Sequence, residues 1–508
     1  MSVLGSTVQS TGNQCGSTYA DSTKCEISCP GGIDSECPAG EFCFRSVECG
    51  SGIDDVDRVP TGSYCGTNST TAGQCSLPCR NGIHADCIDP ELKCFDGIVC
   101  DFLKEDNKDA ECNTTVVCPL NACCSQWGFC GWTEDYCNVD CISDCQYRPS
   151  PPACDGTAPQ VRLGYYASWA TARECRPKPP VSLASIAGDY THLVFSFAHV
   201  SIDFKIEAAA PTDEPLFKEF TDLKVTSPAL RCLIAVGGWA FNDKPTQHRF
   251  TDMTNNTASR AVFIQSAVDF LERYNFDGID LDWEYPGAPD RGGNEGDYAN
   301  YVALITEMRS AFVASGKEFS ITMAVPLSNW YLRHFDINAL QYQLDFFNVM
   351  SYDLHGVWDG VIPTMGAKII PHTNMAEIEE NFKMFWKNGV APHKLVLGLA
   401  AYGRTYTLLN NSCIEVGCEF ESAGAPGECT RVAGFQGHFE IEAIIQSKSY
   451  DSVTFDADTG SMILVKDREW IAYDSADTFS LKKAFAMDNC LRGSMVWSVD
   501  MIDEGIVY

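Results

Sequence analysis

The distribution of cysteine is the feature that most narrowly limits how this chain can fold. Twenty of its 27 cysteines precede residue 146, and the other seven are spread over the rest of the 508 residues. Such density indicates a disulfide framework, which requires an oxidising compartment. No CxxC pair occurs in the sequence, so we do not expect a zinc site. Because the total is odd, at least one thiol stays unpaired if every bridge is internal.

Two further features bear on the compartment. Asn-x-Ser/Thr triplets, which agree with secretion, occur at Asn68, Asn113, Asn255 and Asn410. The N-terminus has neither a basic start nor an apolar segment. We therefore expect that a signal peptide has been removed or that the native chain begins elsewhere. A secreted protein, extracellular or associated with a cell wall, is predicted.

The charge balance excludes several classes of partner. The chain has 68 acidic and 36 basic residues, for a net charge of −32. This argues against nucleic acid and against anionic membranes, both of which bind Lys and Arg. The sequence contains no run of about 18 apolar residues, so we do not expect a transmembrane helix. A hydrophobic fraction of 45% is enough for a large core. We expect the protein to be a monomer.

The first hundred residues contain a repeat. Cysteine intervals of 9, 3, 7, 5 and 5 residues within 13–50 return as 9, 3, 7, 6 and 5 within 63–101. Each unit has about 40 residues, too few for a self-sufficient apolar core, so disulfides must stabilise it. The units resemble short disulfide repeats found beside carbohydrate-active domains. Their aromatic residues either fill a small core or stack on sugars.

A third cysteine module covers 110–145. Its segment Cys123–Cys137 has a CC-x5-C-x6-C core and closely resembles hevein-type chitin-binding domains. The resemblance implies a binding face lined by Ser125, Trp127, Phe129 and Tyr136. It also implies the disulfides Cys112–Cys124, Cys118–Cys130, Cys123–Cys137 and Cys141–Cys145. Aromatic rings suit the apolar faces of N-acetylglucosamine, and so small a module can barely bury them. Chitin and chitooligosaccharides are the expected partners.

A Pro-rich linker is predicted at 146–160, and a different pattern starts at residue 161. Short apolar runs predict strands at 161–166, 191–198, 231–237, 276–284, 319–325, 344–352, 395–401 and 493–499. Helical spacing of apolar residues predicts helices at 259–273 and 297–314. We therefore expect an α/β fold, a (β/α)8 TIM barrel over 161–508, although a doubly wound sheet alternates similarly. The long interval of about 405–485 predicts an α+β insertion after the seventh strand.

The fourth of these strands contains three alternating carboxylates. In Phe276-Asp-Gly-Ile-Asp-Leu-Asp-Trp-Glu284, the residues Asp280, Asp282 and Glu284 share one face of an extended strand. Closely placed buried carboxylates cannot all ionise, so one keeps a proton and can act as a general acid. The alternative is a solvated acidic edge strand. The flanking apolar residues and the position at the carboxyl end of a barrel strand argue against it.

This motif matches the active-site signature of glycoside hydrolase family 18. Matching segments follow in order at 235–239, 350–358, 399–406 and 493–500, and residues 161–508 resemble the fungal killer-toxin-type chitinases most closely. The resemblance implies a substrate-assisted retaining mechanism without metal or organic cofactor. Glu284 would be the general acid, Asp282 would bind the acetamido N–H, and Asp280 would share a proton with Asp282. Tyr352 would hold the acetamido oxygen.

The resemblance also implies a substrate path formed by Tyr165, Phe197, Trp239, Met350, Asp353, Trp358, Tyr402, Arg404 and Trp497. Trp497 would be the platform under the reacting sugar, with Tyr165 and Phe197 as walls. Trp239 and Trp358 would flank the leaving-group side. The alternative for each aromatic residue is ordinary barrel core.

Two residues of the motifs carry alternatives of their own. Arg404 could be a structural ion-pair partner rather than a substrate ligand. Ala235 stands where many family members have Ser, whose hydroxyl belongs to the surroundings of Asp280. The absence of this hydroxyl would alter the proton balance between Asp280 and Asp282, and hence the pH optimum.

The remaining cysteines are assigned only in part. We expect Cys413, Cys418 and Cys429 to form one bridge with one thiol left over, and Cys232 to be a buried thiol.

A secreted chitinase that cleaves β-1,4 bonds is the function we predict. The alternatives are a non-catalytic chitin-binding lectin or toxin-delivery subunit on the same scaffold, and an endo-acting enzyme that cuts N-glycan cores. Family lectins usually lack the general acid, whereas Glu284 is present.

Overall fold

The protein is described from a computed structural model. It describes residues 112–132, 136–138, 140–146, 159–362 and 365–502, together with four short strands nearer the N-terminus. The chain separates into two compact units, Met1–Glu111 and Cys112–Tyr508. Apart from the four strands, the predicted repeats 13–50 and 63–101 lie outside the described residues, as does most of the predicted linker 146–160.

The four N-terminal strands form two matching hairpins. In the first repeat, β1 (Phe42–Phe44) pairs with β2 (Glu48–Gly50), and Cys43 lies opposite Cys49. In the second, β3 (Lys93–Phe95) pairs with β4 (Val99–Asp101), and Cys94 lies opposite Cys100. The same pair of cysteines therefore lies in a hairpin in both repeats.

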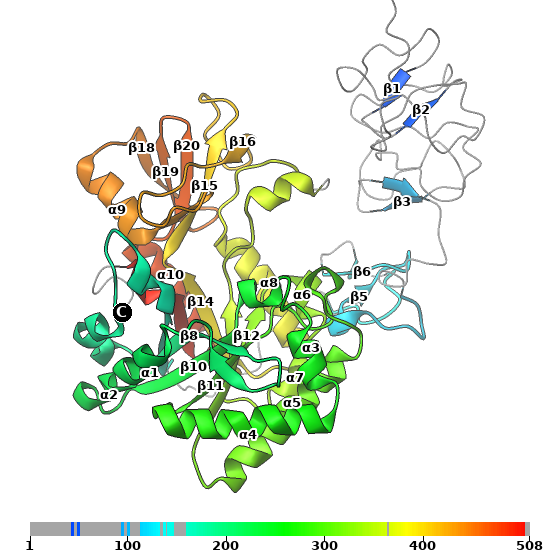
Figure 1. Cartoon of the computed structure of the whole chain (residues 1–508). Helices are drawn as coiled ribbons and strands as arrows, with labels where there is room; N and C mark the ends of the chain where they lie inside the picture. Colours follow the sequence, from blue (N-terminus) through cyan, green and yellow to red (C-terminus); the bar gives the residue numbers. More distant parts are fainter. Residues whose placement is uncertain are drawn as a thin grey trace, which may run out of the picture. The chain divides into compact units, whose positions relative to one another are not determined.

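The chain from residue 161 forms a closed parallel barrel (Figure 1). Its strands are β7 (Val161–Ala167), β8 (His192–Val200), β10 (Arg231–Gly237), β11 (Gly278–Asp282), β12 (Ser320–Pro326), β13 (Phe346–Met350), β14 (Leu395–Ala400) and β21 (Gly493–Trp497). Each strand is parallel to both neighbours, and β21 pairs with β7 to close the ring. The predicted TIM barrel is confirmed, and closure excludes a doubly wound sheet. A short strand, β9 (Ile206–Ala208), pairs antiparallel with β8.

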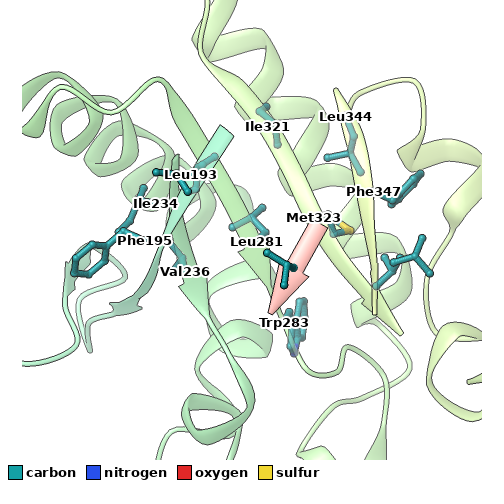
Figure 2. Packing of buried hydrophobic residues seen from close by; sticks show 14 of the residues in the cluster. Leu193, Phe195, Ile234, Val236, Leu281, Trp283, Ile321, Met323, Leu344 and Phe347 are labelled. Carbon is teal, nitrogen blue, oxygen red and sulfur yellow. The ribbon is translucent and has the colours of Figure 1, made fainter. Parts of the chain in front are cut away.

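The strands are apolar on both faces because both faces are covered. One set of side chains fills the barrel interior, including Leu163, Leu233, Ala235 and Met495. The other set packs outward against the helices, and Figure 2 shows part of it: Leu193, Phe195, Ile234, Val236, Leu281, Ile321, Met323 and Phe347. This double burial explains why the strands read as continuous apolar runs in the sequence.

The helices are α1 (Glu214–Thr221), α2 (Leu223–Thr226), α3 (Arg249–Thr254), α4 (Thr257–Tyr274), α5 (Asp297–Ala314), α6 (Asn329–Leu332), α7 (Ile337–Leu340), α8 (Met375–Lys387), α9 (His438–Ser447) and α10 (Ala476–Asp488). The predicted helices 259–273 and 297–314 correspond to α4 and α5. Asn256 caps α4 by accepting a hydrogen bond from the Ser259 N–H at 3.0 Å, and Asn275 ends it with φ of 60°.

Short 3-10 helices lie in the connections: η1 (Pro119–Asn121), η2 (Ser168–Ala172), η3 (Pro180–Ser185), η4 (Ala187–Asp189), η5 (Trp239–Asn242), η6 (Pro289–Arg291), η7 (Val357–Val361), η8 (Pro392–Lys394) and η9 (Val499–Met501). None of the helices described combines the length and the apolar character that a bilayer-spanning segment requires.

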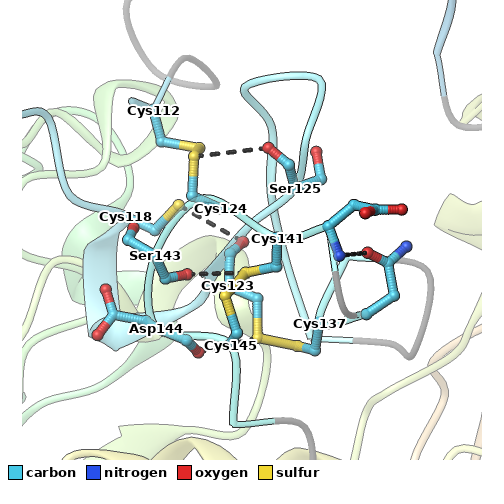
Figure 3. The surroundings of a disulfide bond; sticks show 12 residues. Cys112, Cys118, Cys123, Cys124, Ser125, Cys137, Cys141, Ser143, Asp144 and Cys145 are labelled. Atoms are coloured by element: carbon cyan, nitrogen blue, oxygen red, sulfur yellow. Dashed lines mark hydrogen bonds between the residues drawn. A yellow bond between two sulfur atoms is a disulfide. The ribbon is translucent and has the colours of Figure 1, made fainter. Parts of the chain in front are cut away.

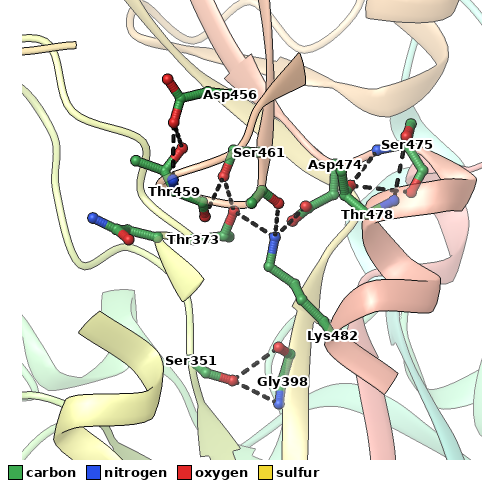
Figure 4. Close-up of polar contacts among 12 residues, drawn as sticks. Ser351, Thr373, Gly398, Asp456, Thr459, Ser461, Asp474, Ser475, Thr478 and Lys482 are labelled. Atoms are coloured by element: carbon green, nitrogen blue, oxygen red, sulfur yellow. Dashed lines mark hydrogen bonds and ion pairs between the residues drawn. The ribbon is translucent and has the colours of Figure 1, made fainter. Parts of the chain in front are cut away.

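The predicted α+β insertion lies between β14 and α10. It contains α9 and an antiparallel sheet of β15 (Tyr402–Leu408), β16 (Phe420–Ala423), β17 (Phe435–Gly437), β18 (Ser452–Asp456), β19 (Ser461–Lys466) and β20 (Glu469–Tyr473). A buried ion pair between Lys482 of α10 and Asp474 fixes its return to the barrel (Figure 4). The same ammonium group donates to Thr373 Oγ1 and to the Gly460 carbonyl, both at 3.3 Å.

Two disulfides stabilise this region. Cys413 bonds Cys418 within the insertion, and Cys175, in the loop after η2, bonds Cys429. The expectation of a leftover thiol among the three insertion cysteines is therefore wrong, because Cys429 is bonded to Cys175, which precedes it by 254 residues. Cys232 is a free, buried thiol.

The hevein-type module consists of η1 and a hairpin of β5 (Cys123–Cys124) and β6 (Cys130–Gly131). Its disulfides are Cys112–Cys124, Cys118–Cys130, Cys123–Cys137 and Cys141–Cys145, the four pairs that the family resemblance implies. Figure 3 shows three of these bridges close together: Cys112–Cys124, Cys123–Cys137 and Cys141–Cys145. Its buried cluster consists of three cysteines and Ala122, so disulfides replace an apolar core.

Candidate active site

Three carboxylates meet at the carboxyl end of β11. Asp280 and Asp282 belong to the strand, and Glu284 follows it by two residues. Their exposed fractions are 0%, 4% and 9%. Buried carboxylates of this kind are costly to ionise unless donors or cations compensate, so their contacts decide where protons reside.

Asp280 is surrounded by hydrogen-bond donors. Its Oδ2 accepts from the Tyr165 hydroxyl at 2.7 Å. Its Oδ1 accepts from the Thr322 hydroxyl at 2.5 Å and from Asn348 Nδ2 at 3.0 Å. The sequence analysis placed Tyr165 in the wall of the sugar pocket and did not identify Thr322 or Asn348. The only signal for these two was their position on the apolar strands 319–325 and 344–352.

Asp282 lies between the other two carboxylates. Burial raises its pKa well above the usual value, and the neighbouring charge of Asp280 raises it further. Among the described residues, its Oδ1 is buried without a hydrogen-bond partner. A buried acceptor without a donor marks a position where a ligand N–H can bind.

Glu284 has the properties of a general acid. Burial raises its pKa to about 7, although the positive charge of Arg291 opposes the shift. Arg291, at the end of η6, donates from Nε to the Glu284 carbonyl at 2.9 Å. Its guanidinium also lies 3.7 Å from the ring centre of Trp239. Arg291 therefore connects the acid with an exposed aromatic ring, a role that the sequence analysis missed.

Tyr352 is positioned by its neighbour in the chain. Ser351 Oγ donates to the Gly398 carbonyl at 2.8 Å and accepts from the Gly398 N–H at 2.9 Å, which joins the end of β13 to β14 (Figure 4). Gly398 is needed there because a Cβ would lie 2.4 Å from the Val349 carbonyl oxygen and 2.9 Å from the Tyr352 ring. The Tyr352 hydroxyl lies 3.9 Å from Met495 Sδ, a weak acceptor, so it can donate to a stronger one.

Aromatic rings gather around Trp497 at the end of β21. The Phe197 ring is stacked on it at 5.6 Å, and Tyr165 is tilted against it at 5.5 Å. Trp169 of η2 lies 6.1 Å from both Trp497 and Phe197 and is 48% exposed. The sequence analysis missed Trp169, although it follows the first barrel strand directly. Met350, half-buried at the end of β13, also packs here.

Both predicted leaving-group tryptophans remain exposed. Trp239 of η5 is 52% exposed and Trp358 of η7 is 38% exposed. The Arg404 guanidinium lies 4.8 Å from the Trp358 ring centre. Each ring therefore packs against an arginine and keeps part of its surface open to solvent.

Arg404 forms the ion pair considered in the sequence analysis. Its Nε and one terminal nitrogen bond the two oxygens of Asp353 at 2.8 and 2.7 Å. Burial alone would raise the pKa of Asp353, but the charge of Arg404 lowers it well below the usual value. Tyr402 is buried and stacks on Phe435 at 4.6 Å.

The Trp358 loop is held by a buried histidine. His355 bonds Asp359 Oδ2 through Nδ1 at 2.8 Å and Glu377 Oε2 through Nε2 at 2.7 Å. Burial would lower its pKa, but the hydrogen bonds with these carboxylates raise it to about 9. A charged His355 therefore joins η7 to α8.

The predicted chitin-binding face of the hevein-type module is partly exposed. Trp127 is 42% exposed, and Phe129 and Tyr136 are half-buried. Ser125 is only 2% exposed, and its Oγ accepts from the Phe129 N–H at 3.2 Å. The three aromatic residues are thus accessible, whereas Ser125 supports the loop that carries them.

Comparison with known proteins matches two family models to the chain. Residues 161–501 match the family model described as Glycosyl hydrolases family 18. Residues 109–145 match the model described as Chitin recognition protein.

Several curated proteins are similar in sequence. The Killer toxin subunits alpha/beta of Kluyveromyces lactis are 31% identical over 75% of this chain and 33% of that protein. The Secreted chitinase LysM12 of Penicillium expansum is 28% identical over 78% of this chain and 28% of that protein. The Endochitinase of Manduca sexta is 32% identical over 67% of this chain and 63% of that protein. The chain thus spans only about a third of the first two relatives.

Solved structures are similar in fold. Group II chitinase catalytic domain 2 of Ostrinia furnacalis superposes with a TM-score of 0.61 at 26% identity, covering 68% of this chain and 90% of that chain. Human YKL-39, described as a pseudo-chitinase with retained chitooligosaccharide binding, gives 0.60 at 25% identity over 67% and 93%. With the family model matching residues 161–501 of 508, the chain belongs to the glycosyl hydrolases of family 18.

Proposed function

We propose that this protein is a secreted chitinase that hydrolyses β-1,4 bonds between N-acetylglucosamine units with retention of configuration. The observation that carries the proposal is the arrangement at the end of β11. Glu284 is buried with its pKa raised to about 7, and the neighbouring Asp282 presents a buried oxygen without a partner among the described residues. An acid and an acceptor side by side suit a sugar with an acetamido group.

In this mechanism Glu284 protonates the glycosidic oxygen, and the bond to the leaving sugar breaks. The substrate's own acetamido oxygen attacks the anomeric carbon and forms an oxazolinium ion. Asp282 accepts a hydrogen bond from the acetamido N–H and stabilises the positive charge of the oxazolinium ion. The Tyr352 hydroxyl orients the acetamido oxygen. Glu284, now a carboxylate, takes a proton from water, which opens the oxazolinium ion with net retention.

The surrounding residues give the substrate a path. Trp497, with Phe197 and Trp169 beside it, is the platform for the reacting sugar and its neighbour. Trp239 and Trp358 receive the leaving-group side, where their exposed faces suit pyranose rings. The hevein-type module holds the enzyme on insoluble chitin and so raises the local substrate concentration. The disulfides support an extracellular location.

The decisive experiment measures hydrolysis of chitohexaose by the full chain, with the product anomers followed by NMR. Initial release of the β-anomer is expected, and initial α-anomer would reject the retaining mechanism. Glu284→Gln is expected to lower kcat by about 10²–10⁴-fold. Glu295→Gln, an exposed glutamate in the loop that follows, is the matched control and is expected to keep wild-type activity.

A second candidate is a chitin-docking subunit without hydrolytic activity. The similarity to the Killer toxin subunits of Kluyveromyces lactis over 75% of this chain favours it. No hydrolysis by the wild type from acidic to neutral pH, with chitin binding retained, would support this candidate and reject the first.

A further inference from the structure

The donors around Asp280 come from three different strands of the barrel. Tyr165 belongs to β7, Thr322 to β12 and Asn348 to β13. Their contacts, at 2.7, 2.5 and 3.0 Å, use both oxygens of the carboxylate. The Asn348 amide nitrogen can only donate, and the two hydroxyls can donate as well. Both oxygens of Asp280 therefore act as acceptors, as they do in an ionised carboxylate.

The strand register shows why Thr322 has this contact. Asp280 lies opposite Ala235 on β10 and opposite Thr322 on β12. Ala235 is fully buried in the barrel interior and offers only a methyl group. The side of Asp280 that faces β10 therefore has no hydroxyl from its register partner, and Thr322 supplies one from the opposite side.

We propose that Thr322 is a positioning residue that holds Asp280 as the proton acceptor of the Asp280–Asp282 pair. The proton that the pair retains then lies on Asp282, which donates it to Asp280, while Asp282 Oδ1 remains available to accept a hydrogen bond from the acetamido N–H. Thr322 itself contacts no substrate. This inference rests on the proposed function, because it assigns the state in which Asp282 meets the acetamido N–H.

Removing the hydroxyl should change the pH dependence of the reaction. Without the Thr322 donor, the singly ionised pair is less stable relative to the doubly protonated pair. A buried hydrogen bond to a charged group contributes enough to move this ionisation by about one pH unit. The acid limb of kcat/KM should therefore move to higher pH by about one unit in Thr322→Val, with KM at the optimum changed by less than about twofold.

The experiment compares pH profiles of chitohexaose hydrolysis. Thr322→Val is expected to shift the acid limb, and Thr322→Ser, which keeps the hydroxyl, is expected to restore it. Thr254→Val is the control for the general effect of replacing a buried threonine away from Asp280. Thr254 on α3 is also 0% exposed and donates to the Thr251 carbonyl at 3.3 Å. Thr254→Val should reduce stability without moving the limb. An unmoved limb in Thr322→Val, or an equal shift in Thr322→Ser, would overturn the proposal.

A serine hydroxyl introduced on β10 tests whether a donor on the other side of Asp280 can replace that of Thr322. In the double variant Ala235→Ser with Thr322→Val, the serine is the register partner of Asp280 on β10 and should return the limb toward its original position. A double variant that behaves like Thr322→Val alone would contradict the idea that one hydroxyl beside Asp280 is what matters.

A spectroscopic measurement separates this inference from the proposed function. The infrared band of protonated carboxyl groups is followed over pH in the wild type, in Asp282→Asn and in Thr322→Val. We expect a band that Asp282→Asn removes, and we expect the bands of the doubly protonated pair to persist to higher pH in Thr322→Val. If the wild type does not hydrolyse chitohexaose, the proposed function fails, yet this band still decides where the proton lies. A band that Asp282→Asn leaves unchanged would reject the inference alone.

Discussion

The hevein-type module and the barrel both present aromatic residues suited to sugars, but they are stabilised by different means. The buried cluster of the module consists of Cys112, Cys118, Cys124 and Ala122. The barrel is filled by branched and aromatic side chains on both faces of its strands. A module without a core must leave Trp127 at the surface, where it can only bind. A barrel with a large core can bury carboxylates and alter their pKa, which catalysis requires.

The largest expected effect comes from reduction of the disulfides. Loss of one native disulfide from a small domain costs about 2–5 kcal/mol, which the module cannot replace by apolar burial. Treatment with a reductant should therefore abolish binding to insoluble chitin. Hydrolysis of soluble chitohexaose should persist, because the barrel interior contains no disulfide among the described residues. Pull-down on chitin and a soluble assay on the same sample measure both.

Parallel loss of the two activities on reduction would break the comparison, because the barrel would then depend on Cys175–Cys429 or Cys413–Cys418. The variant Cys413→Ser with Cys418→Ser is the control for the insertion disulfide. It should leave chitin binding unchanged, since neither residue belongs to the module.

A smaller effect is expected when one aromatic platform is removed at a time, Trp127 from the module or Trp497 from the barrel. Trp127→Ala should weaken binding to insoluble chitin by about tenfold, the equivalent of one stacking contact, and leave kcat/KM for chitohexaose unchanged. Trp497→Ala should lower kcat/KM for chitohexaose by at least about tenfold and leave chitin pull-down unchanged. Equal losses of both readouts in either variant would show that the two sites do not act separately.

The last prediction concerns the pH dependence of the rate. Glu284 acts as an acid only when protonated, and its pKa is raised to about 7 by burial. The rate should therefore be retained below that value and should fall by about tenfold per unit above it. Chitin binding by the module should stay constant across the same range, because the aromatic side chains that carry it do not titrate there. A kcat that stays flat from about pH 6 to about pH 9 would remove Glu284 from its role.

Most of the barrel could be predicted because both faces of its strands are buried. Each predicted strand overlaps an observed one, for example 231–237 with β10 and 395–401 with β14. The insertion was predicted from the length of its interval, but its strand order was not. Antiparallel strands such as β17 and β18 are short and only partly buried, so their pattern is weak.

The site was predictable where a motif carries its own geometry. Asp280, Asp282 and Glu284 lie close together because alternate residues of one strand share a face. Thr322 and Asn348 were not predictable, since their contacts with Asp280 depend on the register of neighbouring strands. Trp169 was missed because its exposure and its contact with Trp497 depend on how η2 turns at the end of β7.

The sequence alone determined the order of modules, the barrel strands, the four disulfide pairs that the hevein resemblance implies and the row of carboxylates. The strands and the row of carboxylates follow from local periodicity, whereas the disulfide pairs follow from the family resemblance. The tertiary structure decided the donors to Asp280, the pairing of Arg404 with Asp353 and the bond between Cys175 and Cys429. Each of these joins residues distant in the chain, and only the closed barrel with its insertion brings them within bonding distance.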